Sequence, residues 1–214
     1  MFTDRRWRLL LVLFAAAIGA APALAQQPSG WDSTAPAAPP AAKKSAKHKP
    51  PAAATTAEAA SAAAGGAKPT LLKQFGDWGA YTASPGGKKI CFAIAKPATS
   101  ETDPPGKSRN SPYMFISSRP AEKVTDEVSI IIGYPFKPNS EATVAIGSTS
   151  FALYTQQDGA WIKNSAEEAN LIAAMRGGHN AVLKGTSARG TRSTDVFSLK
   201  GLAEAIDRSD QECK

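Results

Sequence analysis

Two cysteines, Cys91 and Cys213, are the residues of this chain best suited to chemistry. In an oxidising compartment, an even number of cysteines in a small domain is most simply explained by a disulfide. A redox-active cysteine usually has a resolving cysteine close by, and the sequence contains no Cys-x-x-Cys motif. We therefore predict a structural disulfide between Cys91 and Cys213, with a redox role for Cys91 as the alternative.

His179 is the only histidine after residue 70, so any histidine-dependent hydrolysis by the folded part would have to use it. It follows Gly177-Gly178 in a turn between a helix and a strand, and no Gly-x-Ser-x-Gly elbow accompanies it. One histidine and two distant cysteines cannot supply the three or four ligands of a zinc site. We predict no catalytic residue, cofactor or metal, and a hydrolytic role for His179 stays an alternative.

The first 25 residues have the pattern of a secretory signal peptide. Three arginines within residues 5–8 precede an apolar run from Leu9 to Ala21, and Ala23-Leu24-Ala25 supplies small residues at the cleavage site. The apolar run is shorter than the roughly 20 residues that a membrane span needs. We therefore predict cleavage after Ala25 and a periplasmic or secreted protein.

Residues 26–70 have the composition of a disordered linker, with 16 Ala, seven Pro and five Lys. Residues 57–64 could form a transient helix. We predict that this helix has no apolar face with which to dock on the domain. The basic cluster Lys43–Lys49 could contact an anionic membrane or wall polymer, although a solvated spacer is the simpler interpretation.

Residues 71–214 are long enough for one domain with a sizeable core. After removal of residues 1–25 the chain carries 22 basic and 17 acidic residues, and more than half of this excess lies in the linker. The domain itself is therefore close to neutral, and we predict no nucleic-acid partner.

Short runs of β-branched and aromatic residues alternate with Gly, Pro and Asn along the domain, a pattern typical of antiparallel sheets. We therefore predict a mainly β fold, an antiparallel sandwich or barrel-like domain with two short helices, preceded by the disordered tail. The predicted strands are Phe75–Ala83, Lys89–Ala95, Tyr113–Ser118, Glu127–Tyr134, Thr143–Ile146, Thr149–Thr155, Trp161–Lys163, Ala181–Ser187 and Thr194–Leu199. The segment Pro97–Pro112 is predicted to be a long polar loop.

Ser165 is predicted to cap the first helix, with Glu168 completing a capping box. The apolar positions of this helix are Ala169, Leu171, Ile172 and Met175. The second helix is predicted from Leu202 to Cys213, with Leu202, Ala205 and Ile206 on its apolar face.

At Phe75-Gly76-Asp77-Trp78-Gly79-Ala80-Tyr81 and at Phe197-Ser198-Leu199-Lys200-Gly201-Leu202, the chain resembles the invasion-associated locus B family of alphaproteobacteria. The resemblance implies an all-β secreted domain of the cell envelope, linked in some pathogens to host-cell entry, and it brings no catalytic residues. Many members have a further cysteine where this chain has Thr82, so the family's disulfide pairing cannot be copied here. Trp78, Tyr81, Phe197 and Leu199 are predicted to pack in the core.

Together these observations favour a secreted, non-enzymatic envelope protein that binds a protein or envelope component, with a link to host-cell interaction as the resemblance implies. A periplasmic redox or hydrolytic enzyme using Cys91 or His179 is one alternative. A membrane-surface adaptor that acts through Lys43–Lys49 is the other.

Overall fold

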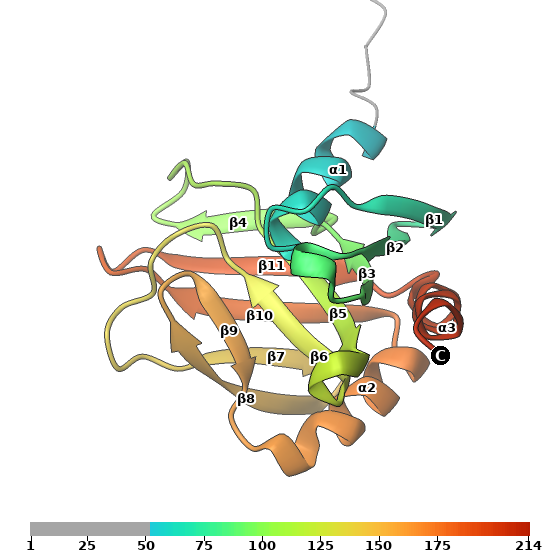
Figure 1. Cartoon of the computed structure of the whole chain (residues 1–214). Coiled ribbons are helices and arrows are strands. Elements are labelled where there is room, and N and C mark those ends of the chain that lie inside the picture. The colour runs from blue at the N-terminus through green and yellow to red at the C-terminus, as the bar shows by residue number, and fades with distance from the viewer. Residues whose placement is uncertain (1–51) are drawn as a thin grey trace, which may run out of the picture. The chain divides into compact units, whose positions relative to one another are not determined.

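The computed structural model describes residues 52–214, shown in colour in Figure 1. The predicted signal peptide and the Lys43–Lys49 cluster lie outside these residues. Within them, eleven strands form one antiparallel sheet, and the predicted mainly β fold is confirmed. The strands are β1 (Thr70–Phe75), β2 (Trp78–Ala83), β3 (Ile90–Ala95), β4 (Thr99–Asp103), β5 (Tyr113–Arg119), β6 (Val124–Ile131), β7 (Ala142–Ile146), β8 (Thr149–Gln156), β9 (Gly159–Ile162), β10 (Asn180–Thr186) and β11 (Arg192–Ser198).

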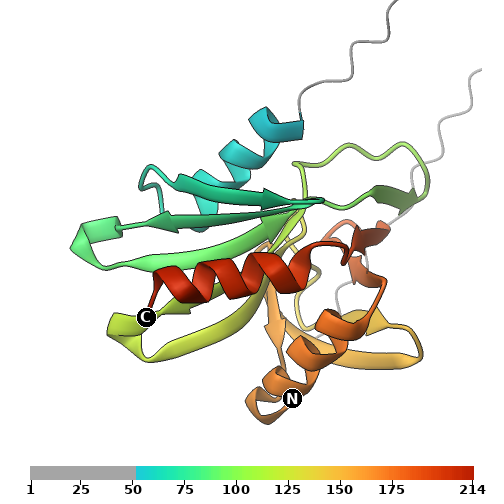
Figure 2. The same cartoon turned by 90° about the vertical axis from the view of Figure 1, so that its right-hand side faces the viewer.

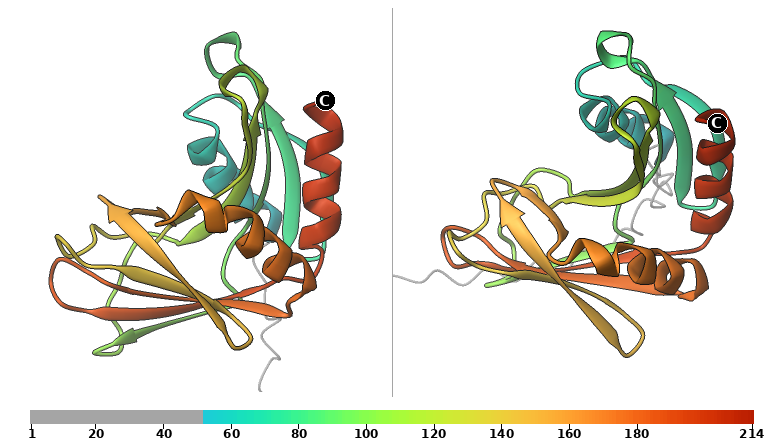
Figure 3. Two further views of the ribbon diagram at one scale, coloured as in Figure 1. Left: turned by 90° about the horizontal axis from the view of Figure 1, so that it is seen from below. Right: turned by 60° about the horizontal axis from the view of Figure 1, so that its bottom comes forward.

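The spatial order of the strands is β1-β2-β3-β5-β6-β9-β8-β7-β10-β11-β4. The sheet is strongly bent. Strands β1, β2, β3 and β5 form one part, which stands at a steep angle to the part formed by β7, β10, β11 and β4 (Figure 3). The main core fills the space inside this bend and draws buried side chains from both parts, such as Trp78, Met114, Leu183 and Phe197. Trp78 and Phe197 are fully buried, and Tyr81 and Leu199 are nearly so, as predicted.

Three α-helices complete the described domain: α1 (Ala52–Ala63), α2 (Glu168–Gly177) and α3 (Leu202–Glu212). None of them is long and apolar enough to cross a membrane. Helix α3 lies across β1, β2 and β3, and Figure 2 shows it in front of these strands. Its buried residues Leu202, Ala205 and Ile206 are those predicted from the sequence, and Ser209 joins them.

The prediction that residues 57–64 have no apolar face to dock is wrong. Ala59, Ala60 and Ala64 are buried against the outer face of the sheet, where they join a second apolar cluster with Tyr81 and Phe92. Figure 3 shows α1 and α3 on opposite faces of β2 and β3, which explains why β3 is buried on both sides. The face of α1 escapes a hydrophobicity pattern because alanine contributes little apolar area, while its small size allows close approach to the sheet.

Two predicted segments of the sheet region differ from the structure. The single strand predicted over Phe75–Ala83 is interrupted by a turn at Gly76-Asp77 and belongs to a β1–β2 hairpin. The predicted loop Pro97–Pro112 contains β4, which pairs with β11. The residues of β4 are polar and mostly exposed, because it is an edge strand, and it therefore lacks the alternation by which strands are recognised.

The start of α2 also differs from the prediction. Asn164, not Ser165, supplies the cap, since its Oδ1 accepts a hydrogen bond of 3.2 Å from the amide of Ala166 at the head of a short 3-10 turn. Glu168 does not close a capping box and instead accepts a 2.7 Å bond from the amide of Val128, which ties the helix to β6. Leu171, Ile172 and Met175 are buried as predicted, but Ala169 is exposed.

The two stretches that carry the family resemblance meet in space. The indole Nε1 of Trp78 donates a 2.8 Å hydrogen bond to the carbonyl oxygen of Ser198, 120 residues away. Gly76 and Gly201 both have positive φ, and a Cβ on Gly201 would lie 2.1 Å from the carbonyl oxygen of Phe75. Only glycine fits such a left-handed position at so close a crossing of two backbones. The two stretches therefore form a single structural junction.

Candidate functional site

The structure joins Cys91, on β3, to Cys213, just after α3, with sulfurs 2.01 Å apart and Cα atoms 5.9 Å apart. Cys91 has no exposed surface, and the chain has no free cysteine. Reactive thiolates occur in exposed, electropositive surroundings, and the buried, disulfide-bonded sulfur of Cys91 lacks these surroundings. The pair therefore has the position of a structural link between the sheet and the C-terminal helix.

His179 lies exposed between α2 and β10. Its backbone carbonyl accepts a 2.9 Å bond from the amide of Leu199, but in residues 52–214 its imidazole makes no hydrogen bond to another side chain. The described part of the chain also contains no group of three His, Cys, Asp or Glu residues placed to hold a metal ion. The geometry that would turn His179 into a general base is thus missing from the described residues.

Two carboxylates face each other near the disulfide. The hydroxyl of Ser118 lies 3.5 Å from Oδ1 of Asp126 and 3.3 Å from Oδ1 of Asp210, so it can donate to either. Burial, followed by the charge of Asp210, raises the pKa of Asp126 from its ordinary 3.8 to about 6. The two carboxylates and Ser118 thus connect the β5–β6 hairpin to α3.

A buried ion pair lies at the opposite end of the domain. Arg109, from the segment that follows β4, pairs through Nη2 with Oδ1 of Asp195 on β11. The side chains are 8% and 0% exposed. Arg109 also donates a 2.7 Å bond from Nη1 to the carbonyl of Ile132, and Ser100 donates a 2.6 Å bond to Asp195. The second carboxylate oxygen of Asp195 has no hydrogen-bond partner among the described residues.

Tyr134 completes this polar cluster. The guanidinium of Arg109 lies over its ring, 5.5 Å from the centroid, and its hydroxyl is 2.7 Å from the hydroxyl of Ser193. Burial raises the pKa of the Tyr134 phenol, so the group stays neutral and available for hydrogen bonding. Gly185 makes room for this ring, because a Cβ there would lie 3.3 Å from the Tyr134 hydroxyl and 2.7 Å from Phe136.

A cleft opens above Arg109 and Tyr134, with a volume of about 320 Å³. We call it the basic cleft. Its walls come from the loop after β4, from the segment after β6 and from the β10–β11 turn. It is lined by Thr102, Lys107, Ser108, Arg109, Tyr134, Pro135, Ser187, Ala188, Arg189 and Thr191. The lining thus contains three cations and five hydroxyl groups but no carboxylate.

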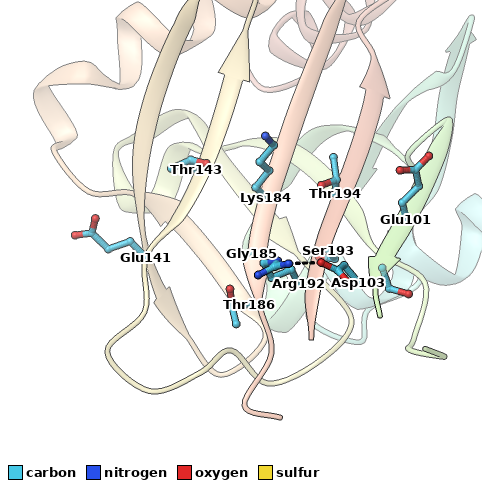
Figure 4. Close-up of a pocket in the computed structure, with 11 residues that line it drawn as sticks. Glu101, Asp103, Glu141, Thr143, Lys184, Gly185, Thr186, Arg192, Ser193 and Thr194 are labelled. Carbon is cyan, nitrogen blue, oxygen red and sulfur yellow. Dashed lines mark hydrogen bonds and ion pairs between the residues drawn. The ribbon is translucent and has the colours of Figure 1, made fainter. Parts of the chain in front are cut away.

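A second hollow, of about 390 Å³, lies on the outer face of β4, β11, β10 and β7 (Figure 4). The register places Glu101, Thr194, Lys184 and Thr143 in one row across the four strands. Figure 4 shows this row beside the ion pair of Arg192 and Asp103. We call this surface the polar trough. It contains both charge signs, and Thr102 lines both it and the basic cleft.

Sequence reasoning did not find the residues of the basic cleft. Arg109 and Asp195 are 86 positions apart and belong to no spacing motif, so only the pairing of β4 with β11 brings them together. One signal was present in the sequence: Asp195 occupies an inward position in the alternation of a strand that also contributes Phe197. An acidic residue at such a position is seldom buried without a cationic partner.

Residues 78–210 match the sequence model of the family described as Invasion associated locus B (IalB) protein. The chain belongs to the IalB family. No curated protein and no solved structure shows significant similarity to it. The match begins at Trp78 and spans the basic cleft, but it ends before Cys213, so the partner of Cys91 lies outside the matched region.

Membership of the IalB family supports an envelope-associated protein, and the family is not known for enzymatic activity. The junction between Gly76-Asp77-Trp78 and Ser198–Gly201 has a structural role in this chain, because both stretches are occupied by the core and by each other. These two stretches are therefore not free to bind a partner. The basic cleft, with its three cations and five hydroxyl groups, is the candidate binding surface.

Proposed function

We propose that this IalB-family protein is exported, acts in the cell envelope without catalysing a reaction, and binds a protein or envelope component through its basic cleft. The observation that carries the proposal is the buried ion pair of Arg109 and Asp195. It places a costly polar group directly beneath an open, polar surface. Burying two charges seldom adds net stability, and such pairs are often kept for specificity or function.

The composition of the basic cleft supports binding over catalysis. Within the described residues, no hydroxyl group that lines the cleft forms a hydrogen bond to a histidine or carboxylate side chain, which is the arrangement that a base-activated nucleophile needs. Hydroxyl groups, guanidinium groups and an aromatic ring are the groups by which a rigid pocket recognises a polar ligand. The polar trough beside the cleft would extend the contact area.

Export through the predicted signal peptide would bring the cleft into the periplasm or to the cell exterior. A role in host-cell interaction, as the family resemblance implies, would use the same surface. Contact of the Lys43–Lys49 cluster with an anionic membrane or wall polymer would add a weak second attachment, and no nucleic acid is needed as a partner.

Site-specific photo-crosslinking tests the cleft as the binding surface. A photoreactive phenylalanine derivative replaces Arg189 at the rim of the cleft, and Lys88 beside the β2–β3 turn in a control chain. Both side chains are exposed. After illumination of the protein in an envelope extract of its own bacterium, we expect a discrete adduct from position 189 and none from position 88. Absence of an adduct at 189, or the same adduct at both positions, would refute the proposal.

The envelope location is tested separately. N-terminal sequencing of the protein from the periplasmic fraction should begin at Gln26 if cleavage follows Ala25. Recovery of the uncleaved chain in the cytoplasmic fraction would contradict the predicted export.

A further inference from the structure

The basic cleft combines three cations with no lining carboxylate, although ion pairs are common elsewhere in the described domain. The described residues form eight ion pairs, of which one contains Arg109. Lys107 and Arg189 take part in none of them, and both are exposed at the rim. Asp195 balances the charge of Arg109, so Lys107 and Arg189 supply the unbalanced positive charge of the cleft. Two cations that share a recess without counter-charge produce a local positive potential that attracts an anion.

Arg109 forms the rigid floor of this recess. Its guanidinium is held by the carbonyl of Ile132, by Asp195 and by the ring of Tyr134, and these contacts leave several of its five N–H donors unused. A planar, fixed guanidinium is suited to two parallel hydrogen bonds with an oxyanion such as phosphate or sulfate. Because the floor is already ordered, an incoming anion would not have to bear the cost of ordering it.

The remaining lining is rich in hydroxyl groups, which suits a sugar ring. Thr102, Ser108, Ser187 and Thr191 can each donate and accept a hydrogen bond. A volume of about 320 Å³ lies at the lower end of the range of small-molecule sites and suits about one substituted monosaccharide. Building on the proposed binding function, we propose that the basic cleft binds a sugar unit that carries a phosphate or sulfate group.

A saccharide fits this surface better than a membrane does. Binding to a bilayer usually combines basic residues with apolar or aromatic side chains that insert between the lipids. The apolar residues lining the cleft are only Pro135 and Ala188, and the ring of Tyr134 lies against Arg109. The recess between three segments also suits a compact ligand more than a flat surface.

Isothermal titration and amide NMR of the full mature chain test the proposal with defined probes: glucose 6-phosphate, glucose 6-sulfate, inorganic phosphate, glucose and phosphatidylglycerol vesicles. The charge of the cleft is reversed by Lys107→Glu with Arg189→Glu. The matched control, Lys68→Glu with Lys88→Glu, makes the same change in net charge at exposed lysines outside the cleft. Unchanged NMR spectra outside the substituted regions would show that both variants fold.

We expect at least one charged sugar to bind more tightly than glucose and than inorganic phosphate, with shifts at Thr102, Ser187 and Thr191. The cleft variant should bind that sugar at least tenfold more weakly, whereas the control should stay within twofold of the wild type. Equal binding by the two variants would overturn the site. Equal affinity for inorganic phosphate would overturn the saccharide, and binding restricted to phosphatidylglycerol vesicles would point to a membrane instead.

The two proposals fail in different ways. If position 189 crosslinks to a partner while neither charged sugar binds, the binding function stands and the ligand class is wrong. If a charged sugar binds and the cleft variant loses it while position 189 forms no adduct, the ligand class stands and the proposed envelope partner is wrong.

Discussion

Two ends of the domain are stabilised by different contacts. Contacts between α3 and the sheet stabilise the end that carries Cys213, whereas a buried ion pair stabilises the end that carries Lys107 and Arg189. At the first end, the disulfide, the contact between Lys89 and Glu212, and the hydrogen bonds of Ser118 join α3 to the sheet. At the second end, the segment after β4 is fixed by the buried Arg109 and by the amide of Asn110, which donates a 3.1 Å hydrogen bond to the carbonyl oxygen of Gly133. Figure 1 shows the C-terminus on the right and the β10–β11 turn on the left.

This difference separates stability from recognition. A covalent link and apolar packing hold the first end, while an internal ion pair orders the second end beneath an open rim. Substitutions at the first end should therefore affect unfolding and leave binding unchanged. Substitutions at the rim of the basic cleft should do the reverse.

Trp78→Ala should have the largest effect on stability, a loss of about 5 kcal/mol, because it removes a fully buried aromatic side chain and leaves the Ser198 carbonyl without its donor. Urea unfolding followed by circular dichroism measures it. Should this variant fail to fold, Trp78→Phe keeps most of the volume and should still cost about 2 kcal/mol. A loss below 1 kcal/mol for Trp78→Ala would show that the junction contributes little.

Loss of the disulfide should rank second. The variant Cys91→Ser with Cys213→Ser frees a loop with a sequence separation of 122 residues. The chain-entropy model gives about 4.9 kcal/mol for such a loop, and we expect a loss of about 4 kcal/mol because disulfides often contribute less than the model predicts. The measurement is the urea midpoint with and without reductant. Thiol titration of native wild-type protein should find both sulfurs blocked. A reactive thiol before reduction would contradict the pairing. Weaker binding of the charged sugar by the double variant would contradict the expectation that the disulfide end affects stability and not binding.

Asp195→Ala should follow, with a loss of about 3 kcal/mol, because Arg109 would remain buried without its counter-charge. Replacing both partners, with Arg109→Met and Asp195→Leu, should restore most of the stability while binding in the basic cleft is lost. A double variant that is stable and still binds would show that the ion pair does not serve the cleft. Denaturant unfolding and the titrations described above provide the two measurements.

The smallest effect should come from pH at the disulfide end. The folded pKa of Asp126 is raised to about 6 by burial and by Asp210, above its unfolded value near 3.8. The stabilising proton is thus fully present below about pH 4, and its contribution is lost as the pH rises through 6. Solvent screening at this half-exposed site limits the change to about 1 kcal/mol. Thermal unfolding from pH 4 to 8 should show it in the wild type and not in Asp126→Asn, and identical profiles would contradict the coupling.

How much the sequence predicted depended on whether the signal was local. Leu171, Ile172 and Met175 recur at helical spacing, and a buried Trp78 follows from its size and its place in a strand, so the core elements were predictable. The buried alanines of α1 carry almost no hydrophobic pattern, and the polar strand β4 is defined only by its pairing with β11. The basic cleft depends on that same pairing and was invisible until the sheet was assembled.

The junction of Trp78 with Ser198 also governs when this domain can fold. Strand β2 is made early, but its tryptophan has neither its hydrogen-bond acceptor nor the cover of α3 until the C-terminal residues exist. Contacts this distant in sequence slow folding, because the closure of a long loop precedes the stabilising contacts. Synthesis must therefore reach α3, at the C-terminal end of the described residues, before this part of the core can close.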